Sequence, residues 1–90
     1  MHYTYVLQSI KDGRWYTGHS SDLRARIDDH LKGRVESTRH RRPLQLIDDE
    51  ACLTEADAKR RERYLKTGKG KRYLRSRHAG LATGLGNSRK

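Results

Sequence analysis

Two residues on one predicted helix could bind a phosphate and move a proton. Arg26 and His30 are four positions apart, so they share a helix face. They sit at one edge of the Leu23/Ile27/Leu31 stripe, and we expect them at the border between core and solvent. A guanidinium binds phosphate, and an imidazole exchanges protons near neutral pH. A solvated arginine beside a surface histidine has the same spacing, and the spacing alone favours that ordinary role.

A carboxylate, Glu62, lies among basic residues on a second predicted helix. Its helical position places it near Ala58 and Leu65, on the side expected to face the sheet. A half-buried carboxylate with cationic neighbours could hold a hard cation such as Mg²⁺. The ordinary alternative is an intrahelical ion pair with Lys66, worth about 0.2–0.5 kcal/mol. Considered alone, Glu62 fits that alternative better.

Two tyrosines, Tyr5 and Tyr16, fall on the two strands of a predicted hairpin. Two phenols near a cation and an arginine could accept a proton and bind a phosphate. More often, hairpin tyrosines pack on the sheet with the hydroxyl in water. The tyrosines by themselves favour this packing role.

Turn and helix signals predict the elements that must position these residues. Asp12-Gly13 suits a tight hairpin turn, Ser20 or Ser21 can cap the first helix, and Thr54 can cap the second. The order predicts an α+β fold with a small three-stranded, mostly antiparallel sheet flanked by helices, β-β-α-β-α-α. In chain order we expect strands over 2–8 and 14–18, a helix from about 20 to 32 and a loop over 34–42. A third strand over 44–47, with a longer extent to 53 left open, should be followed by a helix from 54 to about 67, a break at 68–70 and a helix over about 71–78. Residues 1–78 would form one domain and residues 79–90 a flexible basic tail.

Four short motifs occur in order along this predicted domain. They are Tyr3-Thr4-Tyr5, Tyr16-Thr17-Gly18, Arg26-x-x-x-His30 and Glu62. Their order and spacing resemble the GIY-YIG endonuclease superfamily, and residues 61–70 resemble its short stand-alone bacterial members. The resemblance covers residues 2 to about 77. It implies a three-stranded antiparallel sheet flanked by helices and metal-dependent hydrolysis of a DNA phosphodiester.

The resemblance also implies a role for each matched side chain. Glu62 matches the single metal ligand, normally for Mg²⁺ or Mn²⁺. Arg26 matches the arginine that stabilises phosphate charge. Tyr5 and Tyr16 match the two motif tyrosines, one of which is the general base or orients the water. His30 matches a position that assists proton transfer. Such electrostatic contacts contribute about 3–4 kcal/mol to a transition state.

The chain departs from the family's pattern at several positions. The first motif lacks the glycine and isoleucine, and Thr17 replaces an isoleucine in the second. Gly18 matches the glycine that keeps the backbone close around the site. His19 stands where some members carry lysine, and it could touch the site or be a surface imidazole. Asn87 falls in the expected tail, so the family's late asparagine has no secure counterpart.

The charge distribution points to a polyanionic partner. The net charge is +10, and residues 54–90 carry twelve basic and three acidic side chains, against nine and eight in residues 1–53. This excess exceeds what solubility needs and favours nucleic acid. Contacts to phosphates read no bases, so low sequence specificity is expected. The residues expected to grip DNA are Lys59, Arg60, Arg63, Lys66, Lys69, Lys71, Arg72 and Arg75.

The amino-acid composition counts against disulfide-bonded, zinc-ribbon and membrane-associated proteins. One cysteine makes no internal disulfide and no cysteine zinc ribbon, and no disulfide-linked partner is expected. No apolar run approaches the ~20 residues of a membrane span, the expected location is the cytoplasm, and no membrane partner is expected. Binding to an anionic membrane surface is a weaker hypothesis than binding to nucleic acid, because the second predicted helix lacks a broad apolar face.

These observations predict a metal-dependent endonuclease that hydrolyses DNA with low sequence specificity. Structure-selective, repair-related cleavage stays open, as do RNA as a substrate and the oligomeric state. The alternative is a non-catalytic nucleic-acid-binding module on the same fold. Glu62 counts against that alternative, because a carboxylate repels phosphate unless a metal is present.

Overall fold

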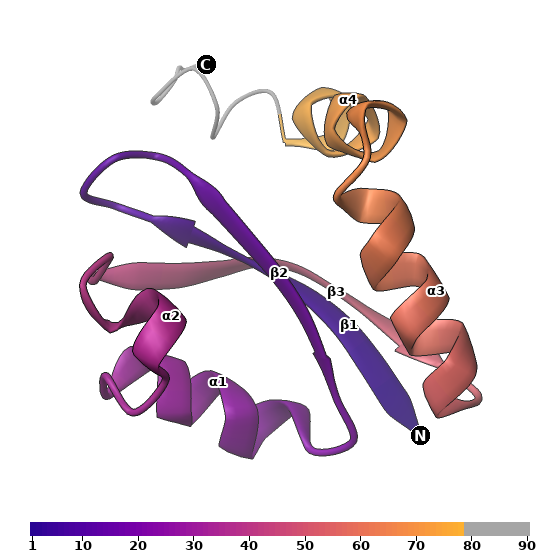
Figure 1. The fold of residues 1–90 in the computed structure, drawn as a ribbon, viewed down its shortest axis with the longest axis horizontal. Helices are drawn as coiled ribbons and strands as arrows, with labels where there is room; N and C mark the ends of the chain where they lie inside the picture. The colour runs from indigo at the N-terminus through magenta and orange to yellow at the C-terminus, as the bar shows by residue number, and fades with distance from the viewer. Residues whose placement is uncertain (79–90) are drawn as a thin grey trace.

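A three-stranded antiparallel sheet lies at the centre of residues 1–78, the part of the chain that this computed structural model describes (Figure 1). The strands are β1 (His2–Ser9), β2 (Trp15–Ser20) and β3 (Leu44–Cys52). Their order in the sheet is β2-β1-β3, so β1 is paired on both edges and β2 is an edge strand. The predicted α+β class and three-stranded sheet are confirmed.

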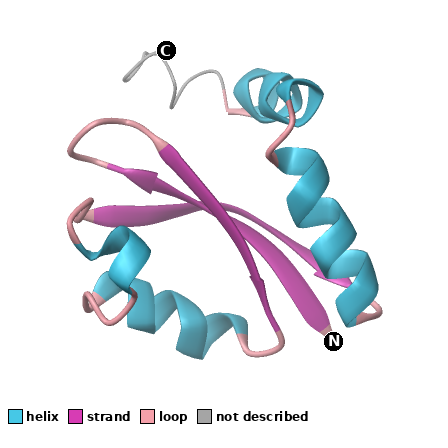
Figure 2. Ribbon diagram, viewed as in Figure 1, coloured by secondary structure: helices cyan, strands magenta, loops and turns pink. Residues whose placement is uncertain are grey.

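Within the same residues, two helices lie to each side of the sheet (Figure 2). They are α1 (Leu23–Leu31), α2 (Glu36–Arg39), α3 (Glu55–Leu65) and α4 (Gly68–Arg77). The three longer helices each begin at a side chain that accepts a hydrogen bond from a first-turn N–H, namely Asp22, Thr54 and Thr67. These caps satisfy backbone donors that the helix itself leaves free.

The central strand β1 supplies the core on both faces of the sheet. Side chains alternate along a strand, so Tyr5 and Leu7 pack towards α1 while Val6 packs against Leu65 of α3 and Leu74 of α4. All five side chains are buried. The sheet therefore separates two small apolar clusters, one against α1 and the other against α3 and α4.

Two boundaries differ from the sequence-based expectation, and a third, which the sequence left open, is decided. The cap of α1 is Asp22, because Ser20 instead ends β2 and its hydroxyl bonds to Asp22. The predicted loop over 34–42 contains α2, a single turn too short to show helical periodicity. Strand β3 continues to Cys52, which confirms the longer of the two expected extents.

The predicted break at 68–70 is wrong, because α4 already begins at Gly68. The Thr67 hydroxyl accepts the Gly70 N–H and starts the helix there. A Cβ on Gly70 would overlap the Tyr64 carbonyl and lie 2.5 Å from the Leu65 Cα. Gly70 thus serves a close approach of α4 to the end of α3 rather than a helix break.

Residues 79–90, expected to be a flexible tail, lie outside the described residues. Among residues 1–78, no helix combines the length and the apolar character needed to cross a membrane.

Candidate active site

A buried chain of polar side chains connects β1, α1 and α2. The Tyr5 hydroxyl lies 2.8 Å from His30 Nε2, and His30 Nδ1 lies 2.8 Å from the Thr38 hydroxyl. All three residues are 1% exposed or less. Buried polar groups are costly without partners, so each of these side chains fixes the orientation of the next.

The direction of the hydrogen bonds follows from the charges around Tyr5. Interaction with the Tyr5 oxygen is the main cause that raises the pKa of Arg26, and a guanidinium can only donate. Burial raises the pKa of Tyr5 despite Arg26, so the phenol keeps its proton at neutral pH. The Tyr5 O–H therefore donates to His30 Nε2, and His30 Nδ1–H donates to Thr38.

The structure corrects the expected place of His30. The sequence predicts Arg26 and His30 at the border of the core, and Arg26 is partly exposed as expected. His30 is fully buried, because the turn of α2 covers it with Thr38. Burial and the Arg26 charge lower the pKa of His30 to about 4. The imidazole is therefore neutral at physiological pH.

This neutral histidine predicts a pH-dependent stability. The folded-state pKa of about 4 lies below the ordinary value of 6.5. Above pH 6.5 His30 is neutral in both states, and as the pH falls from 6.5 to 4 only the unfolded chain takes up the proton. The free energy of unfolding should fall by up to about 3 kcal/mol over that window. Urea denaturation followed by circular dichroism at several pH values measures it.

The control for this prediction is His30→Gln, which carries no titratable group. Its free energy of unfolding should fall less steeply between pH 6.5 and 4 than that of the wild type. Equal slopes in the two proteins would contradict the assignment of a neutral buried His30.

Gly18 leaves the space that the Tyr5 ring occupies. The two residues are direct partners across β1 and β2, and a Cβ on Gly18 would lie 2.5 Å from the Tyr5 hydroxyl oxygen. Gly18→Ala must therefore displace the phenol. We expect a loss of about 1–3 kcal/mol in the free energy of unfolding, measured by thermal or urea denaturation. Gly68→Ala, whose Cβ would meet only Arg72 at 3.8 Å, is the control, and equal losses in both would contradict this explanation.

The edge strand β2 divides the site into two parts. Tyr16 is half-buried, and its ring centroid lies 5.1 Å from that of His30 and 6.5 Å from that of Tyr5. His19, three positions along the strand, points to the opposite face and contacts α3. β2 thus presents one part of the site to α1 and the other to α3.

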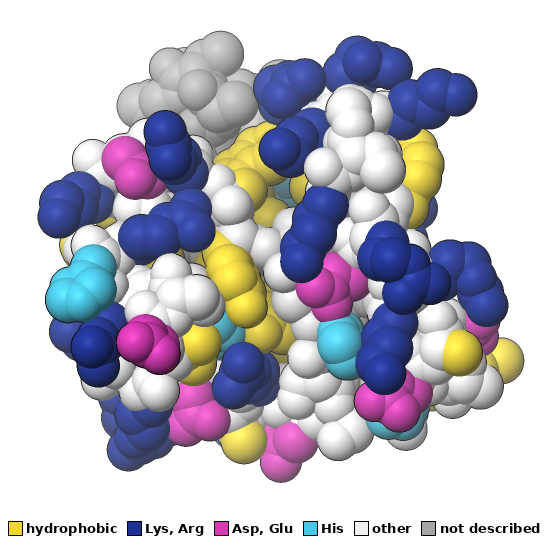
Figure 3. Space-filling model, viewed as in Figure 1, with side chains coloured by type: hydrophobic (Ala, Val, Ile, Leu, Met, Phe, Trp, Pro, Cys, Tyr) yellow, Lys and Arg dark blue, Asp and Glu magenta, His cyan; other side chains and the backbone are white. Residues whose placement is uncertain are grey.

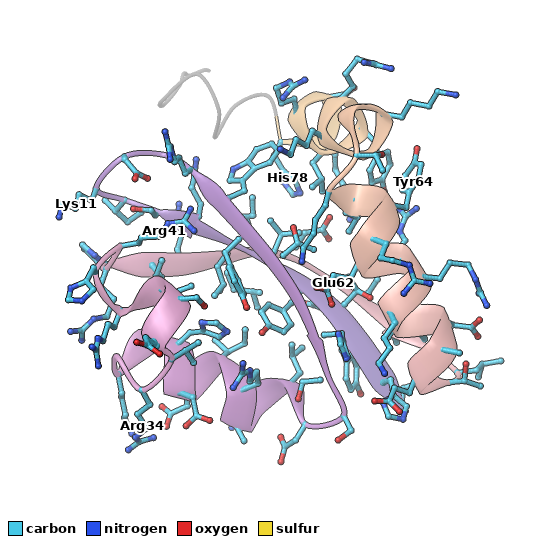
Figure 4. The ribbon with its side chains drawn as sticks, viewed as in Figure 1. Lys11, Arg34, Arg41, Glu62, Tyr64 and His78 are labelled. Atoms are coloured by element: carbon cyan, nitrogen blue, oxygen red, sulfur yellow. The ribbon has the colours of Figure 1, made fainter. Side chains whose placement is uncertain are left out.

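Glu62 is held on the α3 side of this strand. Its Oε1 lies 2.5 Å from His19 Nδ1, and its Oε2 accepts a hydrogen bond of 2.7 Å from Lys66. The carboxylate is 17% exposed and points from α3 towards the sheet, whereas Tyr64 points away (Figure 4). Burial opposes ionisation, but Lys66 and His19 outweigh it and lower the pKa of Glu62. The charge of Glu62 reaches Tyr5 and contributes to its raised pKa.

Glu62 suits a cation that takes few protein ligands. Among residues 1–78, no three His, Cys, Asp or Glu side chains gather as a cage for a metal ion. Mg²⁺ commonly binds one or two carboxylates and fills its other positions with water and substrate phosphate. A partly exposed, ionised carboxylate such as Glu62 offers the required hard oxygen. A cation there would compete with Lys66 for Oε2.

Basic side chains flank the site on both sides (Figure 3). All eight residues expected to grip DNA are exposed, and they lie on α3, at its C-cap Lys66 and on α4. Three of them are partnered by acids: Lys59 by Glu55, Arg60 by Asp57 and Lys66 by Glu62. A second basic group lies near the hairpin turn and α2, in the half of the chain with the smaller net charge. Lys11, Arg34 and Arg41 are labelled in Figure 4. Its members are Lys11, Arg14, Arg34, Arg39, Arg41 and Arg42.

The structure thus brings Tyr5, Tyr16, Arg26 and His30 together on the α1 side and places Glu62 across the strand. Sequence reasoning missed Thr38, which lies in a stretch without periodicity and gives no local signal. For His19 the sequence leaves two roles open, a contact with the site or a surface imidazole. The structure shows its contact with Glu62, which is 43 positions away in the sequence. Such contacts depend on the packing of α3 against β2 and cannot be deduced from spacing.

Comparisons with known proteins agree with this geometry. The GIY-YIG catalytic domain matches residues 1–75. A UPF0213 protein of Staphylococcus saprophyticus is 40% identical over 67 residues, covering 73% of this chain and 80% of the relative, and a UPF0213 protein of Staphylococcus aureus is 35% identical over 75 residues, covering 82% and 90%.

A solved structure is also similar. The solution NMR structure of a UPF0213 protein from Bacillus halodurans has a TM-score of 0.53 and 35% identity, covering 92% of this chain and 93% of that chain. The order of the motifs, the fold around them and the match over most of the described residues lead to one assignment. The chain belongs to the GIY-YIG catalytic domain family, a superfamily of endonucleases, and is similar to the UPF0213 proteins.

Proposed function

We propose that this protein is a divalent-metal-dependent endonuclease that hydrolyses DNA phosphodiester bonds with low sequence specificity. The observation that supports this most is the connected set of Tyr5, His30 and Arg26 beside Tyr16, with the ionised Glu62 across β2. A protein that only binds nucleic acid needs cations, and a carboxylate facing its phosphate site would repel the phosphate.

Arg26 is the group that would stabilise charge on the phosphate. Its guanidinium interacts with Tyr5, which raises the pKa of Arg26, and the side chain is partly exposed. Hydrolysis adds negative charge to the oxygens around phosphorus, and a preorganised cation stabilises that charge most where water is excluded. The buried Tyr5–His30–Thr38 chain would therefore position Arg26 rather than react itself.

Tyr16 is better placed than Tyr5 to contact the attacking water. Tyr5 is buried, and its proton is committed to His30. Tyr16 is partly exposed and packs beside the same imidazole. In the reaction a water oxygen bonds to phosphorus, one P–O bond breaks, and the water loses a proton while the departing oxygen gains one. Tyr16 would orient the water and accept a hydrogen bond from it.

Glu62 would hold the cation, Mg²⁺ or Mn²⁺, opposite Arg26. A bound divalent ion supplies Lewis-acid stabilisation of the phosphate oxygens. Lys66 and His19 keep Glu62 ionised and oriented before the ion arrives. The carboxylate is thereby prepared for a cation without a separate rearrangement of α3.

The basic groups on both sides of the site would bind the DNA backbone. If about six phosphates are neutralised, the logarithm of the binding constant should fall with a slope near −5 against the logarithm of salt concentration. Backbone contacts of this kind position DNA and read no bases. Sequence specificity should accordingly be low.

Cleavage of supercoiled plasmid and branched DNA in Mg²⁺ or Mn²⁺ tests the proposal. We expect nicking that stops when EDTA removes the metal, while gel-shift binding persists in EDTA. Tight binding without cleavage of any substrate in either metal would reject the endonuclease and favour the non-catalytic binding module. Parallel assays on RNA of the same sequence would decide between the two nucleic acids.

A further inference from the structure

A pocket lies beside the candidate site, on the α3 side of β2. It encloses about 310 Å³. Trp15 from β2, Leu65 from α3 and Leu74 from α4 provide its apolar walls, and Tyr16 also lines it. Its volume falls at the lower end of the range for small-molecule sites, about 300–1,000 Å³. The pocket therefore lies along the same edge strand as the proposed reaction centre, with the Tyr16 ring on the α1 side of that strand.

Two lysines give the pocket its charge preference. Lys66 and Lys71 line it and are both exposed. Lys66 forms an ion pair with Glu62, an acidic side chain next to the pocket. An occupant with an apolar flat body and a negatively charged group fits an apolar chamber edged by ammonium groups. A nucleotide has both parts.

We propose that this pocket receives one unpaired nucleobase next to the phosphate that is cut, so that the preferred substrates are DNA flaps, branches or single strands. The proposal rests on the proposed function for its nucleic-acid partner. The base would contact the Trp15 indole and the leucine side chains while the lysines bind its flanking phosphates. Base stacking on aromatic side chains tolerates any sequence, which agrees with low sequence specificity.

A fully paired duplex would use this pocket poorly. A base in a duplex must first unstack and unpair, whereas a base at a flap or junction is already free. The Trp15 indole N–H is buried and has no hydrogen-bond partner among residues 1–78, so the base would meet the ring of Trp15 rather than this donor.

The fluorescence of Trp15, the chain's single tryptophan, reports directly on this pocket. We would titrate the full chain, in EDTA to prevent cleavage, with a DNA flap and with the same flap carrying an abasic site at the junction nucleotide. A third DNA carries the abasic site within a duplex arm. The intact flap and the third DNA should quench Trp15 equally, and the junction abasic site should reduce both quenching and affinity, the latter by about 10-fold.

Equal quenching and affinity for all three DNAs would overturn the pocket proposal. Trp15→Leu should bind the intact and junction-abasic flaps alike in a gel shift, whereas Tyr73→Leu, an aromatic change on the exposed surface of α4, should keep the preference. If Trp15→Leu fails to fold, the three DNAs with the wild type still decide the question. Because the assay needs no catalysis, quenching without cleavage in Mn²⁺ would reject the endonuclease and keep the pocket, and cleavage without base-dependent quenching would do the reverse.

Discussion

Arg26→Ala should lower the single-turnover rate of DNA cleavage by about 10²–10³-fold, corresponding to about 3–4 kcal/mol of lost transition-state stabilisation. The reason is electrostatic, because Arg26 interacts with Tyr5 and Tyr16 and is partly exposed. A surface arginine that only grips DNA would affect binding, whereas Arg26 should affect the chemical step. DNA affinity, measured by gel shift in EDTA, should change little, since many other basic side chains remain.

Arg24→Ala is the matched control, because Arg24 lies on the same helix and is exposed. It removes the same charge and should leave the cleavage rate near that of the wild type. Arg26→Lys retains the charge but loses the planar donor geometry, and an intermediate rate is expected. Equal rates for the Arg24 and Arg26 variants, or a loss in Arg26→Ala explained entirely by weaker binding, would contradict the role given to Arg26.

The sheet and the longer helices were predictable because their signals are local. Alternating aromatic and β-branched residues mark β1, and the Thr54 cap marks the start of α3. Burial of Ala58 and Leu65 on the sheet side of α3 confirms the helical face deduced from periodicity. These features depend on neighbours within a few residues, so a single sequence carries them.

The details of the site depended on contacts between distant segments. His30 was expected at the border of the core, but Thr38 from the short α2 covers it. Four residues give no periodicity, so neither α2 nor the neutral state of His30 could be deduced from spacing. The start of α4 at Gly68 was missed for a related reason, since the close packing of Gly70 on α3 outweighs its low helix propensity.

For Glu62 the sequence offered two readings, an intrahelical pair with Lys66 or a metal ligand. The structure contains the pair with Lys66, and it adds His19 from β2. The two interpretations are compatible, because under the proposed function a cation would replace the lysine at Oε2. Periodicity predicted that Glu62 faces the sheet, while its partner on β2 became visible only in the folded chain.

The most direct test of Glu62 as the metal ligand of the proposed endonuclease is single-turnover cleavage of branched DNA in Mn²⁺. The proteins compared are the wild type, Glu62→Gln and Glu55→Gln. Glu55 is the matched control, because it pairs with Lys59 at the same i,i+4 spacing on α3 but is exposed at the start of the helix. The substitution of an amide preserves side-chain size and removes the charge that would hold the cation.

We expect Glu62→Gln to lose about 10²–10³-fold in cleavage rate and to bind Mn²⁺ more weakly by electron paramagnetic resonance, with DNA binding in EDTA preserved. Glu55→Gln should match the wild type in all three measurements. Cleavage by Glu62→Gln at the rate of the Glu55→Gln control would contradict the assignment of Glu62 as the metal ligand and place the metal on another carboxylate.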